Sequence, residues 1–171
     1  MEPDPHFEFQ HTEIYEKAME IAQLGHYLSQ LCKNPDLEHP ELVEEYGFQI
    51  AADASMIPLK IAGAWDAELY DLKMENAVII RKAARDIMAA AEVLKSMGIK
   101  ETDYLELLCD ALEEFRILFV EWVSTFDPFN YITDRWGLFN PPGTSYDDPD
   151  EDFPFDPDDD LPFGSDEDFP F

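Results

Sequence analysis

Basic residues are scarce in this sequence, and none follows Arg135. Eleven Lys and Arg stand against 39 Asp and Glu, which gives a formal charge of −28. Generic binding to nucleic acid draws its affinity from clustered Lys and Arg, so this charge balance argues against it. The same balance favours a partner with a basic surface, or simply high solubility.

Cysteines and long apolar runs are also scarce. Cys32 and Cys109 lie in apolar helical patterns without the spacing of a disulfide framework, which is typical of reduced, buried thiols. The first residues, MEPDPHFEF, lack the basic region and apolar run of a signal peptide. No stretch approaches the roughly 18 uninterrupted apolar residues of a membrane-spanning helix. We therefore expect a cytoplasmic protein without a membrane partner.

Motifs for catalysis are absent as well. There is no Gly-rich phosphate loop, no Cys-x-x-Cys pair and no serine elbow. A di-iron bundle needs Glu-x-x-His on two helices, and the sequence has one copy, Glu8–His11, ahead of the first helical pattern. The acidic neighbours Glu106 and Asp110 would raise the pKa of the Cys109 thiol and make it less reactive. The sequence therefore predicts no enzyme, no cofactor and no metal site.

Helical periodicity predicts four helices. They cover about 12–33, 40–64 and 67–97, with a fourth from Thr102 or Asp103 to about 126. Pro40 suits a first helical position, and Gly98 suits a helix end. Long helices with short connections pack as antiparallel neighbours. We therefore expect an all-α protein, an up-down four-helix bundle.

Apolar stripes define the predicted core. On the first, third and fourth helices they are Ile14, Ala18, Ile21, Leu28 and Cys32; Ala77, Ile80, Ala84, Ile87, Ala91 and Leu94; and Tyr104, Leu108, Ala111, Phe115, Leu118 and Trp122. A second apolar edge comprises Tyr15, Ala22, Leu31, Leu107, Phe119 and Val123. Stripes this wide indicate burial between subunits of a homo-oligomer, or a thick monomeric core.

Helical periodicity ends after Phe126. The aromatic stretch 127–140 is expected to fold back onto the bundle, and the PPG sequence at 141–143 interrupts the chain. We therefore assign 1–140 to a bundle with an aromatic extension. Residues 141–171 are rich in Asp, Pro and Phe without any base, which predicts a disordered acidic tail.

The stretch QIAADASMIPLKIAGA (49–64) resembles a signature of small four-helix-bundle proteins. These are encoded in 23S rRNA intervening sequences, and they are similar to the accessory variability determinant (Avd-like) proteins of diversity-generating retroelements. The matching positions are Gln49, Ile50, Ala54, Ile57, Pro58, Ile61 and Ala62. With IYEKAMEIAQ (14–23) and AAAEVLKSMGI (89–99), the resemblance covers about 7–126.

That resemblance implies a non-enzymatic bundle assembled as a ring, typically a pentamer. In the retroelement branch it also implies binding to nucleic acid and to a reverse transcriptase through basic surfaces. The chain departs from the pattern at Ala51, Ala52, Asp53, Lys60, Gly63 and Ala64. The basic cluster Arg81, Lys82 and Arg85 would be the nucleic-acid contact on this alternative. Glu75, Asp86 and Glu92 are close enough in sequence to make it an ordinary salt-bridged face instead.

A four-residue motif recurs every eight residues at the end of the sequence. Asp-Phe-Pro-Phe at 152–155 returns as Asp-Leu-Pro-Phe at 160–163 and as Asp-Phe-Pro-Phe at 168–171. FDPDDDLPF (155–163) resembles the acidic C-terminal tip of bacterial single-stranded DNA-binding proteins. In that family the last Phe enters an apolar pocket and its carboxylate meets a basic residue on a repair or replication protein. The last copy, ending at Phe171, would supply that carboxylate.

The predicted partner-binding residues follow from this motif: Asp158, Asp159, Asp160, Leu161, Pro162, Phe163, Asp166, Glu167, Asp168, Phe169, Pro170 and Phe171. Proline pre-sets an extended backbone, acidic flanks attract a basic partner, and the aromatic rings supply buried area. A solubilising tail is the alternative, although such a tail has no use for regularly spaced Phe. A third reading has the tail folding back into a basic groove of its own assembly, for which few bases are available.

The sequence thus predicts a non-enzymatic, homo-oligomeric scaffold or adaptor, a pentamer by resemblance. Its tails would bind a basic, apolar-floored pocket on a DNA replication, repair or recombination protein. Nucleic acid is not an expected partner of the acidic bundle. The alternative is a nucleic-acid-binding accessory subunit of a reverse transcriptase.

Overall fold

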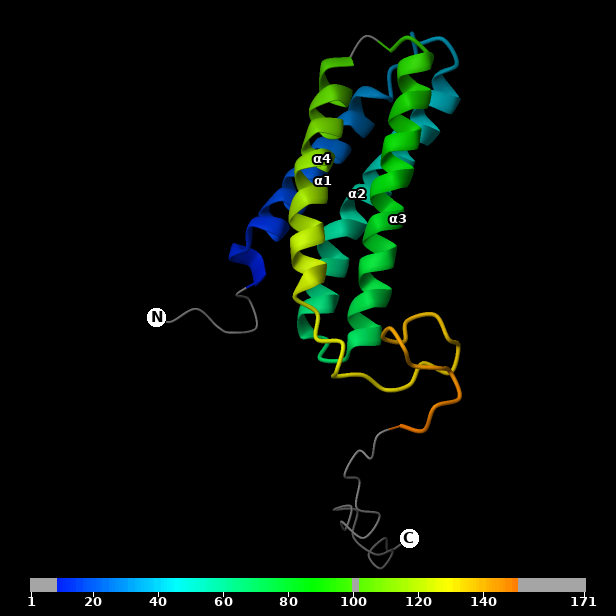
Figure 1. The fold of residues 1–171 in the computed structure, drawn as a ribbon. Helices are drawn as coiled ribbons and strands as arrows, with labels where there is room; N and C mark the ends of the chain where they lie inside the picture. Colours follow the sequence, from blue (N-terminus) through cyan, green and yellow to red (C-terminus); the bar gives the residue numbers. More distant parts are fainter. Residues whose placement is uncertain (1–8, 100–101, 151–171) are drawn as a thin grey trace, which may run out of the picture.

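The computed structural model describes residues 9–99 and 102–150, and these ranges contain four α-helices and no strand. The helices are α1 (Glu13–Leu31), α2 (Pro40–Asp66), α3 (Tyr70–Ser96) and α4 (Thr102–Ser124) (Figure 1). Each lies within a few residues of its predicted range, so the prediction of an all-α, four-helix protein is confirmed. None of these described helices has both the length and the apolar character needed to cross a bilayer.

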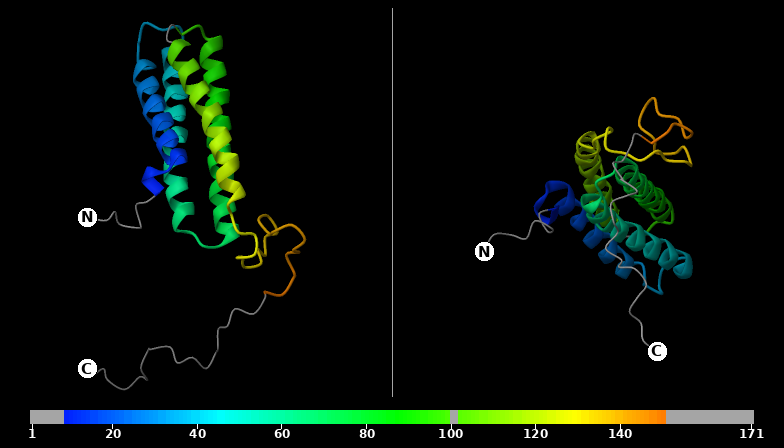
Figure 2. Two further views of the ribbon diagram at one scale, coloured as in Figure 1. Left: turned by 60° about the vertical axis from the view of Figure 1, so that its left-hand side comes forward. Right: turned by 90° about the horizontal axis from the view of Figure 1, so that it is seen from below.

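Successive helices run up and down, and each packs against its neighbours around a square (Figure 2). The α1–α2 and α2–α3 seams are the most closely packed, and the α3–α4 seam is the least. Gly98 ends α3 with a φ of 72°, a left-handed conformation that glycine adopts without strain. The difference between the seams leaves the bundle closely packed around α2 and more open between α3 and α4.

The core contains most of the predicted stripes; the exceptions are Ala84, Tyr104, Leu118 and Trp122, and the last two are half-buried. Every predicted residue of α1 is buried, as are Ile80, Ile87 and Leu94 of α3. Ala84 is only half-buried, since Ala83 faces the core in its place. Tyr104 is exposed, and its ring lies 4.9 Å from that of Tyr27 at the edge between α1 and α4.

Residues 127–150 form a hydrogen-bonded layer of loops at the end of the bundle where α3 begins and α4 ends (Figure 1). We call this segment the loop layer. The backbone N–H of Tyr70 donates to the carbonyl of Asn130 at 2.7 Å, and the Asn130 side chain donates to the Glu68 carbonyl at 3.1 Å. The aromatic extension therefore lies against the bundle, as expected.

Candidate functional site

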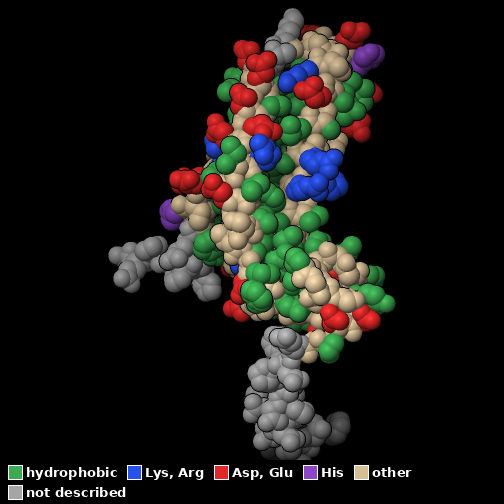
Figure 3. Space-filling model, viewed as in Figure 1, with side chains coloured by type: hydrophobic (Ala, Val, Ile, Leu, Met, Phe, Trp, Pro, Cys, Tyr) green, Lys and Arg blue, Asp and Glu red, His purple; other side chains and the backbone are tan. Residues whose placement is uncertain are grey.

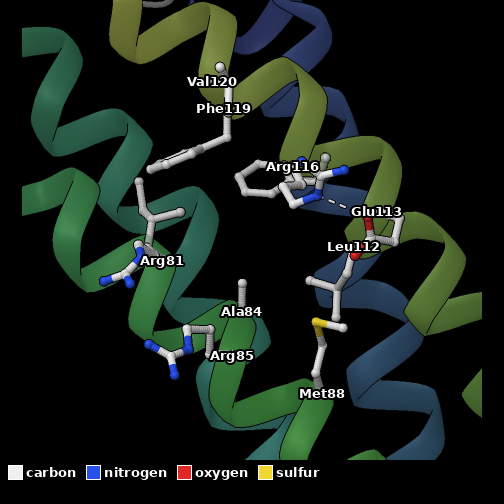
Figure 4. Close-up of a pocket in the computed structure, with 11 residues that line it drawn as sticks. Arg81, Ala84, Arg85, Met88, Leu112, Glu113, Arg116, Phe119 and Val120 are labelled. Atoms are coloured by element: carbon white, nitrogen blue, oxygen red, sulfur yellow. Dashed lines mark hydrogen bonds and ion pairs between the residues drawn. The ribbon is translucent and has the colours of Figure 1, made fainter.

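The open α3–α4 seam contains a groove with a cavity volume of about 320 Å³. Apolar side chains from both helices line it, among them Ala84, Met88, Leu112, Phe115, Phe119 and Val120 (Figure 4). Phe115 is nearly fully buried at the groove floor, whereas Val120 is exposed at its edge. A groove of this size and lining suits an apolar side chain of a ligand.

Arginines border the groove on both sides. The sequence contains four arginines, and three of them line this groove: Arg81 and Arg85 from α3, and Arg116 from α4. On the face seen in Figure 3, basic side chains flank a strip of hydrophobic ones over these two helices. An apolar floor with arginines on both of its helices can bind acidic, aromatic ligands once the guanidinium groups turn towards them.

The three groove arginines differ in their partners. Arg116 Nε donates to Glu113 Oε2 at 2.9 Å, so its charge is partly neutralised. Arg81 and Arg85 have no ion pair with a described acidic residue. Their guanidinium groups lie on the side of α3 away from α4 (Figure 4). As exposed, flexible side chains, both can swing towards a bound anion.

Lys82 does not belong with these arginines. Its ammonium group is paired with the Asp86 carboxylate one turn further along α3, and this hydrogen bond raises the pKa of Lys82. Asp53 on α2 lies near the same pair, and its pKa is raised, first by burial and then by repulsion from Asp86. The prediction of a salt-bridged face holds for Lys82 and is wrong for Arg81 and Arg85.

The fourth arginine organises the loop layer. Arg135 Nη1 donates to the carbonyls of Tyr146 and Asp148 at 3.1 and 2.8 Å, and Nη2 donates to Asp150 Oδ2 at 3.0 Å. The other oxygen of Asp150 accepts a 2.9 Å bond from the backbone N–H of Thr133. We call these contacts the Arg135 clamp. They tie residues 146–150, which the sequence assigned to the tail, to Arg135 and Thr133 in the first half of the loop layer.

Asp134 shapes the other half of the loop layer. Its carboxylate accepts hydrogen bonds from the backbone N–H groups of Trp136, Leu138 and Phe139 at 2.8–2.9 Å. These bonds lower the pKa of Asp134, with Phe139 the largest cause. Three donors on one carboxylate fix the turn at 134–139.

The turns of the loop layer present aromatic side chains to the outside. Phe129 and Trp136 are each 90% exposed, and Leu138 and Tyr146 are also largely exposed. Phe126, immediately before the loop layer, is instead buried against Trp122, with the Lys73 ammonium 5.6 Å from its ring centroid. The extension is thus anchored through its backbone and Phe126, while most of its large side chains remain available for contact.

The predicted partner-binding residues, Asp158–Phe163 and Asp166–Phe171, lie outside the described residues. The Arg135 clamp ends at Asp150, two residues before the first motif copy. Sequence reasoning missed both Arg116 and the clamp. The signal was present, because only four arginines occur in the chain and one of them is the last base before the acidic tail.

Cys109 was the candidate nucleophile of the sequence. The pKa of the Cys109 thiol is raised, as predicted, although burial is the larger cause and the acidic neighbours add to it. Among residues 9–99 and 102–150, no three His, Cys, Asp or Glu side chains are grouped as metal ligands would be.

Comparisons of the chain with protein-family models, with curated proteins and with solved structures gave no match. The resemblances stated from sequence therefore stay predictions. The groove, the loop layer and the motifs that follow it are the features that bear on function.

Proposed function

We propose that this chain is a non-enzymatic adaptor, a homo-oligomeric helical bundle that presents acidic Asp-(Phe/Leu)-Pro-Phe motifs to a partner. The partner has a basic pocket with an apolar floor and belongs to DNA replication, repair or recombination. The Arg135 clamp is the observation that carries this proposal.

The clamp supports presentation because it fixes the point from which the motifs start. Guanidinium bonds to two carbonyls and one carboxylate hold the chain to the loop layer as far as Asp150. Asp152 opens the first motif copy immediately afterwards. A short tether from a folded body raises the effective concentration of each motif near a bound partner.

The motifs supply the binding chemistry. Residues 151–171 contain nine acidic residues, five Phe and no base. Acidic groups speed encounter with a basic surface, and proline lowers the entropy lost when an extended segment docks. The Phe side chains provide the apolar area that makes the encounter stable.

Assembly is supported by an apolar stripe on the outer face of α2. Phe48 is 72% exposed and Leu59 is 64% exposed, about 20° apart around the helix, while Met56 is exposed about 60–80° to one side of them. Large apolar side chains in a row on a helix surface favour burial against another subunit. A ring, five-membered by the family resemblance, would multiply the tails and convert weak single contacts into avidity.

Binding of the intact chain to candidate partners tests this function. We would label the full chain with a fluorophore and titrate it with purified replication and repair proteins that bind the acidic tip of single-stranded DNA-binding proteins. Saturable binding is expected, and it should be lost when Phe153, Phe155, Phe163, Phe169 and Phe171 are all changed to Ser. A chain in which Phe129 alone is changed to Ser is the matched control. Equal binding by the wild-type and five-Ser chains would contradict the proposal.

Native mass spectrometry tests assembly separately. A homo-oligomer is expected for the wild type, and Phe48→Glu with Leu59→Glu should reduce it to monomer. Replacing two exposed polar residues of the same helix, Glu45 and Gln49, by Ala should leave the mass unchanged. A monomeric wild type would remove the avidity argument while leaving the single-motif argument in place.

The accessory-subunit alternative keeps one specific observation in its favour, since Arg81 and Arg85 have no described acidic partner. The overall charge of −28 opposes it. Titration with labelled RNA at low salt decides the matter. Binding that disappears in Arg81→Glu with Arg85→Glu would support this alternative, and no binding by the wild type would remove it.

A further inference from the structure

We propose that the α3–α4 groove is a docking site for residues 151–171 of the same chain, so that the bundle holds one of its own acidic motifs until a partner displaces it. The docking is argued from the groove itself. Its regulatory consequence, that a partner must compete with the groove for the tail, rests on the function proposed above.

The groove and residues 151–171 are complementary in charge. The first 135 residues carry a net charge of −16, from 27 acidic and 11 basic residues, yet three of the four arginines gather at this one groove. Two of them, Arg81 and Arg85, have no ion pair with a described acidic residue. Arginine forms strong paired hydrogen bonds with carboxylates, and residues 151–171 carry nine of them.

The groove floor suits the Phe side chains of the motif. It is apolar along both helices, from Val120 and Phe119 to Met88 and Leu112. A Phe side chain entering it would leave water and pack on rings and thioether, which favours docking. An acidic residue preceding that Phe would then lie beside the arginines at the edge.

The length of the groove along α3 matches the length of one extended four-residue motif. At a rise of about 1.5 Å per residue, Ile80 to Met88 on α3 spans about 12 Å. Four extended residues span about 13 Å, and copies eight residues apart are separated by about 27 Å. One copy therefore fills the groove at a time.

Chain length and position permit the contact. The loop layer lies at the end of the bundle where α3 begins and α4 ends (Figure 1). From that end the groove begins roughly 6–15 Å along the helices, at Val120 and Ile80. Residues 151–171 extend to about 70 Å, so the second and third copies, at 160–163 and 168–171, have the length to reach it. The Arg135 clamp sets the starting point on the correct end of the bundle.

A competition experiment with full-length chains tests the docking. The probe is a fluorescein-labelled peptide of residues 151–171, followed by anisotropy. The chain with all five tail Phe changed to Ser has a vacant groove and should bind the peptide saturably. The wild-type chain should bind it about tenfold more weakly or worse, because its own tail occupies the groove.

Variants in the five-Ser chain locate the binding site. Arg81→Ala with Arg85→Ala should weaken peptide binding about tenfold or more, and Ala84→Trp should block the groove with the arginines intact. Lys82→Ala is the matched control, since Lys82 lies between them on α3 but is paired with Asp86, and it should bind as the parent does. Circular dichroism of every variant shows whether the bundle is retained.

Three outcomes overturn the docking. The first is no saturable binding of the peptide to the five-Ser chain. The second is binding that the arginine and Ala84 variants leave unchanged, and the third is equal affinity in the wild-type and five-Ser chains. A groove that binds a labelled oligonucleotide in preference to the peptide, or whose variants change the oligomeric mass, would assign it to another occupant. None of these assays uses a partner protein, so failure here is distinct from failure of the adaptor function.

Discussion

Gly25 on α1 and Ala54 on α2 mark a close approach of these two helices: a Cβ placed on Gly25 would lie 2.7 Å from the Cβ of Ala54. No pair of carbon atoms tolerates that separation without movement. A second glycine, Gly47, repeats the relationship, with a Cβ at 2.6 Å from that of Cys32. The α1–α2 seam is therefore set by two missing side chains.

Substitution at Gly25 should be destabilising despite the gain in helix propensity. Overpacking costs about 1–3 kcal/mol, and alanine recovers up to about 1 kcal/mol in a helix. We expect Gly25→Ala to lower the free energy of unfolding by up to about 2 kcal/mol, the difference of those terms, measured by urea denaturation.

Gly63→Ala is the matched control on α2. Gly63 is exposed, and a Cβ there would meet only the Asn76 side chain, at 3.3 Å. This variant should be as stable as the wild type or more so, through helix propensity. Equal stability of the Gly25 and Gly63 variants would contradict the close approach.

Substitutions at Phe126 and Phe129 should differ sharply in their effect on stability, although the two residues are only three positions apart. Phe126 is buried against Trp122 at a ring-centroid distance of 4.8 Å, whereas Phe129 is 90% exposed. Phe126→Ala should cost about 3 kcal/mol of unfolding free energy, as buried Phe truncations do. Phe129→Ala should leave stability unchanged. Chemical denaturation of both variants checks this, and a similar loss for the two would show that the loop layer is placed differently.

Removing the charge at Asp53 should stabilise the protein at neutral pH. Its Oδ2 is buried without a hydrogen-bond partner, and burial followed by Asp86 raises its pKa above the ordinary 3.8. The cost of ionising Asp53 is absent below pH 3.8 and complete above its folded pKa. Asp53→Asn should therefore raise the urea midpoint at pH 7, and the difference should vanish as the pH falls below 3.8.

The control for this prediction is Asp36→Asn, an exposed position in the connection between α1 and α2. It should leave the midpoint unchanged at both pH values. A stabilisation by Asp53→Asn that persists in acid would locate its origin in packing rather than charge.

The turn at 134–139 should survive to unusually low pH. Backbone hydrogen bonds lower the pKa of Asp134, so their contribution is present above pH 3.8 and is lost as the pH falls through the lower folded value. Following the Leu138 and Phe139 amide resonances by NMR, we expect a titration midpoint below 3.8. Asp134→Asn should abolish that titration, and a midpoint at or above 3.8 would contradict the geometry.

The groove was only partly predictable from sequence. Arg81 and Arg85 are four residues apart, and this spacing places them on one side of α3. Lys82 is adjacent in sequence but turned by about 100° around the helix. It faces Asp86 one turn away instead of the groove. Arg116 was missed because it lies on another helix, and no local pattern places it opposite Arg81.

By itself, the sequence determined the four helices, their order and most of the core, because apolar periodicity, Pro40 and Gly98 act within a few residues of chain. The tertiary structure decided two other features. The α3–α4 seam stays open and brings three arginines to one apolar groove. The Arg135 clamp holds residues that composition alone assigns to a tail. The groove depends on residues of two helices, whose distances are set only once the helices have packed. The clamp joins groups 11–15 residues apart in a segment without periodicity, so no local pattern predicts it.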